Sequence, residues 1–320
     1  VNYQNSDPTV AGNSDLNNAD HGNVVGALGS GGYAASTVVT LTTGNEPDQH
    51  VVAGDANYTI DFGFYQLSLG NQVWNDLNNS GDINPGEPGV DGVQVVLLLN
   101  GTPVQTTTTA GGGYYTFTNL MSGTYAVAIT APTGYVSSAP TEVNPDANVD
   151  SNDNGVTQVG QTITSGPITL TPGNEPVVVG ATGSTLNPTL DFGIVIPLEL
   201  GNLVWFDTND NGLVDGGEVG VNGVTVELYR DTNGDGVFTP GTDVYMSTTT
   251  TANGGYYTFP YLFTGGYLVV ITSTNFTGAG ALVNYQNSDP TVAGNRDLNN
   301  NDHGNVVGAL GSGGYAASTV

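Results

Sequence analysis

One 38-residue segment occurs twice in this chain, at the two ends of the sequence. Residues 283–320 repeat residues 1–38 at an offset of 282 residues. The copies differ at two positions, with Arg296 for Ser14 and Asn301 for Ala19. Because a self-contained product has no reason to begin and end within the same unit, the repeat predicts a tandem array with a long period. We expect either a longer chain or a chain that its neighbours complete.

A shorter repeat divides the long unit into two related domains. Residues 70–95 match residues 201–226 at an offset of 131, whereas a later "GGYYTF" block recurs at an offset of 142. The second copy therefore carries an insertion of 11 residues. Both copies of the domain end repeat as well, with "GNEP" followed by "DFG".

These repeats predict three segments. They are the back half of a domain at residues 1–66, a complete domain at 67–197, and at 198–320 a domain that lacks the last strands, which are equivalent to 39–65. In one interpretation, these strands of one copy complete the open sheet of the next copy by strand addition. In the other, the sequence is an arbitrary cut from a continuous chain.

The local pattern is typical of β-strands. Val224, Val226 and Leu228 alternate with other residue types, and clusters of Gly, Pro or Asn interrupt such runs about every ten residues. Thr, Asn and Tyr are abundant, which favours strands and turns over helices. The sequence predicts an all-β chain of tandem Ig-like antiparallel β-sandwiches.

The charge balance excludes several classes of partner. The chain has 29 acidic residues and two basic ones, with a formal net charge of -27 and no lysine. It therefore has nothing with which to neutralise nucleic-acid phosphates, and an anionic membrane surface would repel it. Apolar runs are too short to insert in a membrane, and without cysteine the chain forms no disulfide. Divalent cations are the counter-ions that this composition favours.

Two Asp/Asn-rich loops stand at matched positions between the strand patterns, at residues 76–87 and 207–218. Both follow the calcium loop of an EF-hand, with oxygen-bearing side chains at positions 1, 3, 5, 9 and 12, Gly at position 6 and a backbone carbonyl at position 7. The predicted calcium ligands are Asp76, Asn78, Ser80, Asp82, Asn84 and Glu87 in the first loop and Asp207, Asn209, Asn211, Leu213, Asp215 and Glu218 in the second. Plain turns are the alternative interpretation, because Asp, Asn and Gly favour turns.

The 11-residue insertion carries a third loop of this kind. Asp231, Asn233 and Asp235 occupy positions 1, 3 and 5, but position 12 is Thr242 and the acidic residue, Asp243, comes one residue later. We predict these three residues and Asp243 as calcium ligands, and a plain turn is the alternative interpretation for this loop as well.

A weaker Asp/Asn run lies at residues 150–155, with copies at 15–22 and 297–304. Its candidate ligands are Asp150, Asn152 and Asn154. The run either completes a calcium site from a distant loop or forms ordinary turns.

An enzymatic function is not expected. The chain has three histidines, His21, His50 and His303, and none between residues 67 and 282. A Ser/His/Asp hydrolase site would need one in each domain. Paired-carboxylate catalysis needs a general acid, which the Asn-rich loops do not offer.

These motifs together resemble the SdrD B-like domain, a relative of the collagen-adhesin B-type fold of bacterial surface proteins. The resemblance rests on the W-x-D-x-N loop ending in Glu, a G-V-x-V strand and a G-x-Y-x-F strand in fixed order, and it covers nearly the whole chain. It implies a small β-sandwich that binds Ca²⁺ in loops at one end and stiffens a stalk outside the cell. Ser80 and Asn84 replace expected carboxylates, which would weaken the first site. Without lysine, the isopeptide bond of related domains is impossible.

We therefore expect a structural segment of an extracellular filament or stalk, stabilised by Ca²⁺ and located at the cell surface. Its expected partners are neighbouring copies of the same repeat. An adhesin that binds a host or neighbouring-cell ligand is the alternative, and a non-catalytic module of a secreted enzyme is a third possibility. Because a ligand-specific tip would be unique rather than copied, the near-identical segments favour the structural role.

Overall fold

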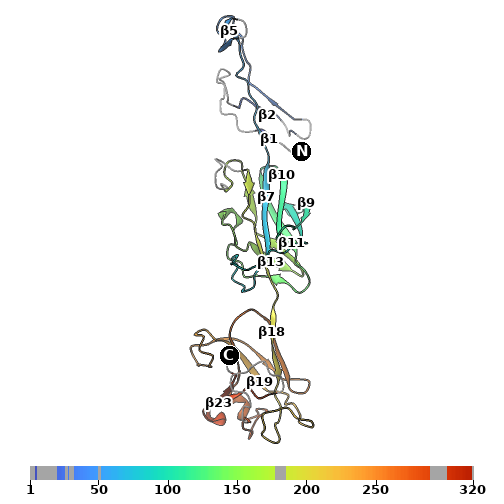
Figure 1. The fold of residues 1–320 in the computed structure, drawn as a ribbon, viewed down its shortest axis with the longest axis vertical. Coiled ribbons are helices and arrows are strands. Elements are labelled where there is room, and N and C mark those ends of the chain that lie inside the picture. The colour runs from blue at the N-terminus through green and yellow to red at the C-terminus, as the bar shows by residue number, and fades with distance from the viewer. Residues whose placement is uncertain are drawn as a thin grey trace. The chain divides into compact units, whose positions relative to one another are not determined.

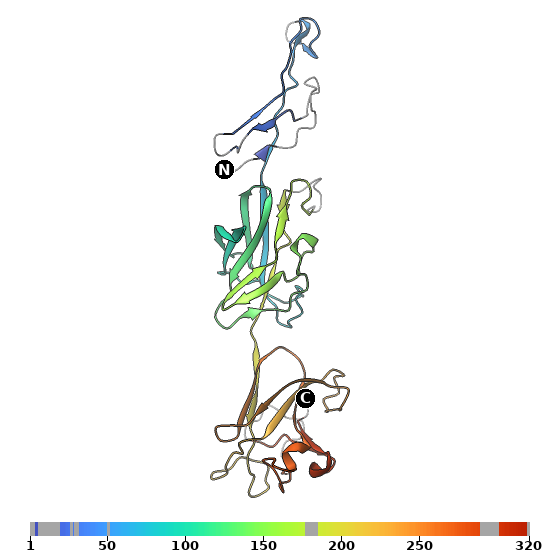
Figure 2. The same cartoon turned by 180° about the vertical axis from the view of Figure 1, so that it is seen from behind.

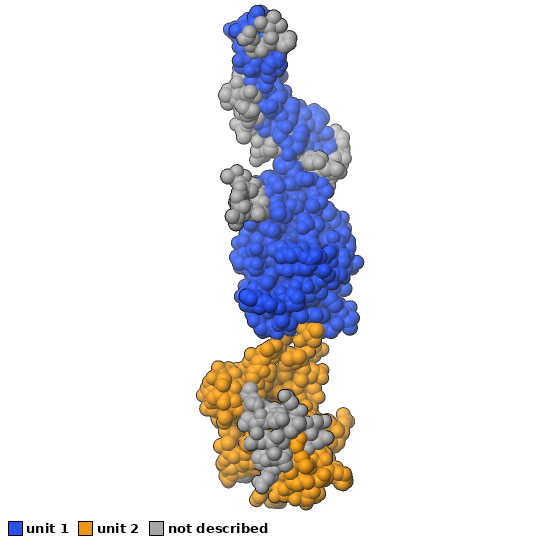
Figure 3. All heavy atoms as spheres, in the orientation of Figure 1, with its two compact units in different colours: residues 1–195 blue, residues 196–320 orange. Residues whose placement is uncertain are grey.

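The computed structural model describes residues 4–5, 20–25, 28, 32–49, 52–176, 185–288 and 301–318. The chain divides into two compact units, residues 1–195 and 196–320, which are coloured separately in Figure 3. Each unit has its own β-sheets and its own apolar core. The three-segment division remains a prediction.

Residues 67–195 form a sandwich of two β-sheets, seen from opposite sides in Figures 1 and 2. Its elements are β7 (Leu67–Asn75), β8 (Gln94–Leu99), β9 (Thr102–Thr108), β10 (Tyr114–Leu120), β11 (Gly123–Thr130), β12 (Val136–Ser137), the 3-10 helix η1 (Pro145–Ala147), β13 (Gly155–Val159), β14 (Thr162–Ser165), β15 (Ile168–Leu170), β16 (Leu186–Asn187) and β17 (Phe192–Val195). One sheet has the strand order β10-β7-β17-β12, with β16 also on β7. The other has the order β13-β14-β11-β8-β9, with β15 also on β11.

The core lies between these sheets because alternate side chains of each strand point inward. Val127 and Ile129 of β11 are buried together with Leu97 of β8 on one side and Leu69 and Phe117 of the other sheet. Burying each such side chain contributes about 1.5–3 kcal/mol. The predicted all-β sandwich fold is confirmed.

The short strand β17 lies inside its sheet and determines how this domain closes. It runs parallel to β7, with Phe192 opposite Val73 and Ile194 opposite Asn75, and antiparallel to β12. Phe192 and Ile194 are fully buried. A Cβ atom on Gly193, between them, would lie 2.1 Å from Ser138 Oγ, so glycine is needed at this position.

The described residues before 67 form three short antiparallel strand pairs, β1 with β6, β2 with β3 and β4 with β5. Their bounds are β1 (Gln4–Asn5), β2 (Asn23–Val25), β3 (Tyr33–Ala35), β4 (Asp48–Gln49), β5 (Ala53–Ala56) and β6 (Phe64–Tyr65). Residues 57–63 share the pattern N-x-T-x-D-F-G with residues 187–193, which lead into β17. In both, the threonine hydroxyl donates to the asparagine Oδ1, at 2.6 and 2.8 Å.

The second unit has two sheets, β18-β21 and β20-β19-β22-β24-β23. Its elements are β18 (Leu198–Leu203), β19 (Thr225–Arg230), β20 (Val244–Thr250), β21 (Tyr256–Leu262), β22 (Tyr267–Ile271), η2 (Ser273–Phe276), β23 (Asn305–Val307), η3 (Leu310–Ser312) and β24 (Tyr315–Ala317). Strand β18 corresponds to β7, but within the described residues it pairs with β21 alone. No helix among the described residues is both long and apolar enough to cross a membrane.

Candidate calcium loops

The first loop begins where β7 ends, and its first residue organises it. Asp76 is fully buried, and its carboxylate accepts backbone N–H groups from Ser80 at 3.0 Å and Gly81 at 2.8 Å. Gly81 has φ +78°, and a Cβ atom there would lie 2.0 Å from Ala139 O. The sequence requirement for glycine at position 6 therefore has a steric cause.

The acidic residue at position 12 closes this loop. Glu87 Oε1 accepts the N–H of Leu77 at 3.0 Å, and Oε2 accepts the N–H of Asn84 at 2.9 Å. One carboxylate thus holds the second and ninth positions together, and the loop is folded around its two acidic ends.

The second loop repeats the same hydrogen bonds. Asp207 Oδ2 accepts the N–H of Gly212 at 2.7 Å, and Glu218 accepts from Thr208 at 2.8 Å and from Asp215 at 2.9 Å. Burial tends to raise the pKa of Asp207, but the backbone donors, led by Gly212, outweigh it and lower the pKa. The carboxylate at position 1 is thereby kept ionised.

The loops differ at position 9. The amide nitrogens of Asn209 and Asn211 both donate to Asp215 Oδ2, at 2.9 and 2.8 Å. In the first loop, the Asn84 amide instead donates to Ser80 Oγ at 2.7 Å. The second loop therefore gathers an additional carboxylate where a cation would be coordinated.

The third loop has the same backbone organisation. Asp231 Oδ2 accepts the N–H of Gly236 at 3.0 Å, and Asp235 Oδ1 accepts the N–H of Val237 at 2.8 Å. Asp243 Oδ2 accepts the N–H of Thr239, the ninth residue of the loop, at 2.6 Å. Asp243 thus makes the contact to position 9 that Glu87 and Glu218 make in the other loops.

Asp243 also carries an unusual buried atom. The residue is 7% exposed, and its Oδ1 has no hydrogen-bond partner among the described residues. A buried carboxylate oxygen without a donor costs free energy, which a bound cation would recover. This atom fits a cation ligand better than it fits a plain turn.

The carbonyl-bearing residues at position 7 connect the loops to distant residues. Asp82 forms an antiparallel bridge with Asn152, and Leu213 forms the same bridge with Asn301. Ile83 N–H donates to Ser151 O at 2.9 Å. The Asp/Asn run at residues 150–155 therefore lies against the first candidate calcium loop, and the described part of its copy, at residues 301–304, lies against the second.

The candidate ligands of that run have separate environments. Asp150 Oδ1 accepts from the Asn71 amide at 2.8 Å. Asn154 Oδ1 accepts the N–H of Asp191 at 2.8 Å, and its amide donates to Glu142 O at 2.9 Å. Asn154 thus connects the Asp/Asn run at residues 150–155 to Asp191, the residue directly before β17. The counterparts Asp15, Asn17, Asp297 and Asn299 lie outside the described residues.

Two buried acids were not anticipated from the sequence. Burial raises the pKa of the Asp153 carboxyl to about 7, although hydrogen bonds from Gly155 and Gly193 lower it. Burial also raises the pKa of Asp191 well above its usual value, and the nearby charge of Asp150 adds to this rise. The sequence signal that could have identified these two acids is the repetition of the triplets that contain them, D-(N/H)-G at residues 20–22 and 153–155 and D-F-G at residues 61–63 and 191–193.

The donor set suits Ca²⁺ rather than a metal that prefers nitrogen. In the described part of the chain, no three His, Asp or Glu side chains come together as a metal cluster. Each loop instead combines carboxylate oxygens with amide, hydroxyl or backbone carbonyl oxygens, which are the hard ligands that calcium accepts. The residues present fit the ion.

Comparison with known proteins agrees with this organisation. The sequence profile of the SdrD B-like domain matches residues 67–175 and 198–311. The chain belongs to the SdrD B-like domain family. The resemblance inferred from the sequence motifs is confirmed, and the two matches include both of the aligned candidate calcium loops of this SdrD B-like chain.

Two staphylococcal proteins are similar in sequence to this chain. The SdrD B-like chain is 36% identical over 248 residues to serine-aspartate repeat-containing protein D of Staphylococcus aureus strain Newman, covering 73% of this chain and 16% of that protein. It is 35% identical over 218 residues to serine-aspartate repeat-containing protein F of Staphylococcus epidermidis, covering 67% of this chain and 11% of the relative. The chain therefore spans less than a fifth of the length of these relatives.

Solved structures give weaker similarities to the SdrD B-like chain. The shaft pilin SpaA from Lactobacillus rhamnosus GG matches at 12% identity and a TM-score of 0.25, covering 64% of this chain and 87% of the pilin. A streptococcal ancillary pilin matches at 15% identity and a TM-score of 0.24, covering 74% of this chain and 60% of the pilin.

Proposed function

We propose that this chain is a structural segment of an extracellular filament or stalk, built of SdrD B-like β-sandwiches that Ca²⁺ stabilises. The observation that carries the proposal is the common fold of three loops, each closed by an acid that holds the position-9 N–H. The near-identical 38-residue segments supply the repetition that a filament needs.

Calcium would act as the cross-link of each domain. Asp76 stands at the end of β7, and the same loop is bridged through Asp82 to Asn152. An ion held by the loop would therefore connect a core strand to a segment more than sixty residues away in sequence. With no cysteine and no lysine in the chain, neither disulfides nor lysine isopeptides offer this connection.

The net charge of the chain also favours bound cations. A formal charge of -27 favours expansion of the chain, and bound cations would offset that repulsion. Each site stabilises the fold by about 2.7 kcal/mol when free calcium exceeds the dissociation constant a hundredfold. Extracellular calcium modules bind at roughly 0.1–1 mM, so several sites per chain would be needed for a large effect.

The proposed structural role includes no catalytic function, and it places the chain at the cell surface. None of the histidines lies in the calcium loops, and the names of the curated relatives state no enzymatic activity. In the adhesin alternative, a ligand-specific tip is expected to be unique rather than copied. The nearly unchanged 38-residue segment supports the structural role instead.

Negative-stain images of the full chain, recorded in calcium and in excess chelator over a range of concentrations, test this proposal. Uniform fibres that lengthen with concentration in calcium are the expected result. Isolated particles that stay monomeric in both conditions, and that attach to cells or matrix proteins, would contradict it in favour of the adhesin.

A further inference from the structure

The chain contains six Asn–Gly pairs, and one of them has surroundings unlike those of the other five. In this dipeptide the backbone nitrogen of glycine can attack the side-chain carbonyl carbon of asparagine, because glycine places no side chain beside that nitrogen. The pairs begin at Asn100, Asn154, Asn211, Asn222, Asn233 and Asn253, and all of them lie in the described part of the chain. Their local structure therefore decides which of them reacts.

Asn100 and Gly101 form the two-residue loop of the hairpin between β8 and β9, in which Leu99 pairs with Thr102. Their φ values are 51° and 77°, and a type I′ loop requires positive values at both positions. Both residues are exposed, and a Cβ atom on Gly101 would have no neighbour within 4 Å. The reacting groups of this pair are thus open to water.

No acceptor holds the Gly101 amide. Within the residues that the structure describes, neither the Gly101 N–H nor the Asn100 side chain has a hydrogen-bond partner. The strand pairing of the hairpin ends at Leu99 and Thr102 and leaves the two loop residues outside it. The Gly101 nitrogen can therefore approach Asn100 Cγ without breaking a hydrogen bond.

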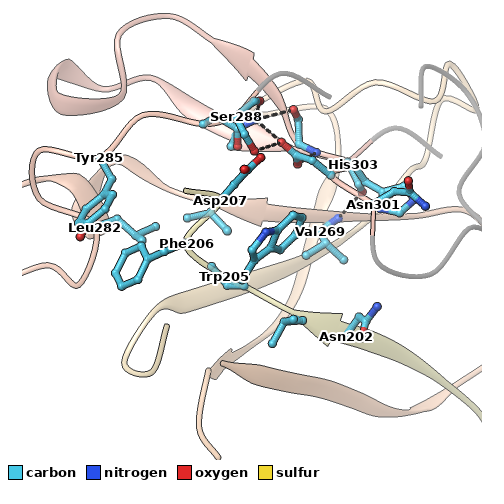
Figure 4. Close-up of a pocket in the computed structure, with 18 of the residues that line it drawn as sticks. Asn202, Trp205, Phe206, Asp207, Val269, Leu282, Tyr285, Ser288, Asn301 and His303 are labelled. Carbon is cyan, nitrogen blue, oxygen red and sulfur yellow. Dashed lines mark hydrogen bonds between the residues drawn. The ribbon is translucent and has the colours of Figure 1, made fainter. Parts of the chain in front are cut away.

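Three of the other glycine amides donate to carboxylates. Gly212 N donates at 2.7 Å to Oδ2 of Asp207, which lines the cavity shown in Figure 4. The other two bonds run from Gly155 N to Asp153 Oδ1 and from Gly234 N to Asp231 Oδ1, both at 2.8 Å. The attack requires loss of the amide proton, and a neighbouring negative charge disfavours that loss. These three pairs are therefore protected by the hydrogen bond and by the charge.

The last two glycine amides donate to neutral oxygens. Gly223 N donates to Thr251 O at 2.9 Å, and Gly254 N donates to Asn222 Oδ1 at 2.9 Å. The attack would have to break these hydrogen bonds first, which raises its barrier.

Asn253 provides the best comparison with Asn100. It is exposed and has a φ of 54°, and Gly254 after it has a φ of 93°. The two pairs differ at the glycine amide, which Asn222 holds in one pair and no described residue holds in the other. A comparison of Asn100 with Asn253 therefore tests the effect of this hydrogen bond.

We propose that Asn100 is a site of spontaneous deamidation, at which the chain modifies itself without an enzyme. The Gly101 nitrogen forms a bond to Asn100 Cγ, the bond from Cγ to Nδ2 breaks, and ammonia leaves with the proton that Gly101 gives up. The product is a cyclic succinimide. The chain has no lysine and no cysteine, so neither a lysine amine nor a cysteine thiol of the chain competes with water to open this ring.

Water opens the ring in two ways. Cleavage of the new bond, between Gly101 N and Cγ, gives aspartate at position 100. Cleavage of the original peptide bond gives isoaspartate, whose backbone passes through the side chain and is one carbon longer. Asp-Gly also suits a type I′ loop, so the aspartate product keeps the hairpin. The isoaspartate product lengthens the loop and should loosen the adjoining ends of β8 and β9.

Either product places a negative charge in a stretch that has none. Residues 92–141 contain no charged side chain, and β9 lies at the edge of its sheet. Deamidation therefore marks an uncharged part of the domain surface as the protein ages. This inference depends neither on the proposed filament function nor on calcium binding.

Incubation of the folded full-length chain in mildly alkaline buffer, followed by peptide mapping with mass spectrometry, tests the proposal. Because the chain has only two basic residues, a protease that cleaves after aromatic residues and leucine should produce the peptides. We expect deamidation at Asn100 to be at least about fivefold faster than at Asn253. An isoaspartyl methyltransferase, used as a reagent, should label the peptide that contains Asn100.

The same incubation in denaturant separates the effect of structure from that of sequence. Unfolding frees every glycine amide, so the rates at Asn100 and Asn253 should become similar. Equal rates at these two residues in the folded chain would overturn the proposal. A preference for Asn100 that is unchanged in denaturant would also overturn it, as would a folded chain that does not react at Asn100 while the denatured chain does.

Variants at Asn222 test the protecting hydrogen bond directly. Asn222→Ala removes the acceptor of the Gly254 amide, so the rate at Asn253 should rise toward that at Asn100. Asn222→Asp is the matched control, because the equivalent Asp91 accepts two glycine N–H groups in the same way, and it should leave Asn253 slow. Melting curves show whether both variants are folded. An unchanged rate at Asn253 in folded Asn222→Ala would contradict the protection on which the proposal rests.

Discussion

Asp153 Oδ1 accepts the backbone N–H of Gly193 at 3.1 Å, and this bond joins the Asp/Asn run to the strand that closes the sandwich. The same oxygen accepts the N–H of Gly155 at 2.8 Å. Since Asp20 and Gly63 repeat the bond at 3.2 Å, the D-(N/H)-G and D-F-G triplets form a structural pair that occurs twice in this chain. The closing strand is thus held by an acid that is itself buried.

Gly193→Ala should destabilise the domain at residues 67–195 by about 1–3 kcal/mol, because the added methyl group overpacks a closed core. The Cβ atom would contact Ser138 and Trp74. Gly123→Ala is the matched control, since its Cβ atom would meet neighbours no closer than 3.6 Å. Denaturant unfolding of the full chain measures both variants, and equal stabilities would refute the proposed tight fit.

The effect of Asp243→Asn on the melting temperature should have opposite signs in chelator and in calcium. In chelator the variant loses a buried carboxylate oxygen that has no partner, so its melting temperature should equal or exceed that of the wild type. In calcium it loses a ligand and should melt below the wild type. Thermal melts in both buffers check this, and a variant that is less stable than the wild type in both would show that Asp243 is purely structural.

The two aligned loops should bind calcium with different affinities. Asp215 adds a carboxylate that Asn84 does not supply, and affinity rises with the charge of the ligands. Asp215→Asn should weaken the second loop by about tenfold, and Asn84→Asp should strengthen the first by a similar factor. Calorimetric titration of calcium into the two full-length variants measures these affinities. Unchanged calcium affinities in both variants would exclude the position-9 side chain as a ligand.

Asp91 should make the stability of the domain at residues 67–195 sensitive to acid. Hydrogen bonds from the Gly113 and Gly112 backbone lower the pKa of Asp91 below its usual 3.8. Since a lowered pKa in the folded state stabilises the charged form, this contribution is present above the unfolded pKa and disappears as pH falls through the folded pKa.

Asn222 provides the comparison for this prediction. In the second domain its Oδ1 accepts the N–H groups of Gly254 at 2.9 Å and Gly255 at 2.8 Å, without a titratable group. Asp91→Asn should therefore keep the fold at neutral pH and lose less stability than the wild type as the pH falls below the usual aspartate pKa of 3.8. Melting temperatures across that range measure the difference, and parallel pH profiles would contradict it.

The sequence predicted the strands and the loop frameworks because both depend on local patterns. Alternation placed Val224, Val226 and Leu228 in the core, and each is buried. The spacing of acids and glycine anticipated loops closed by Glu87 and Glu218, and the structure shows both closures. Calcium occupancy of these loops remains a prediction.

The sequence could not predict contacts that depend on distant segments. Asn154 was a candidate ligand, but its side chain bonds to the Asp191 N–H, which lies 37 residues away. The burial of Asp153 and Asp191 likewise follows from the closing strand and not from their neighbours in sequence. The sequence shows that Asp243 stands one residue after position 12 of its loop. It does not show that Asp243 Oδ1 is buried without a hydrogen-bond partner, because this depends on the three-dimensional packing.

Thermal unfolding of the full chain in calcium and in excess chelator, with bound ions counted by native mass spectrometry, tests the central claim most directly. The account predicts that the melting temperature falls by more than about 10 °C in chelator and that ions are retained in calcium. The same melting temperature in both buffers, with no bound ions, would reduce the three loops to ordinary turns and contradict the account.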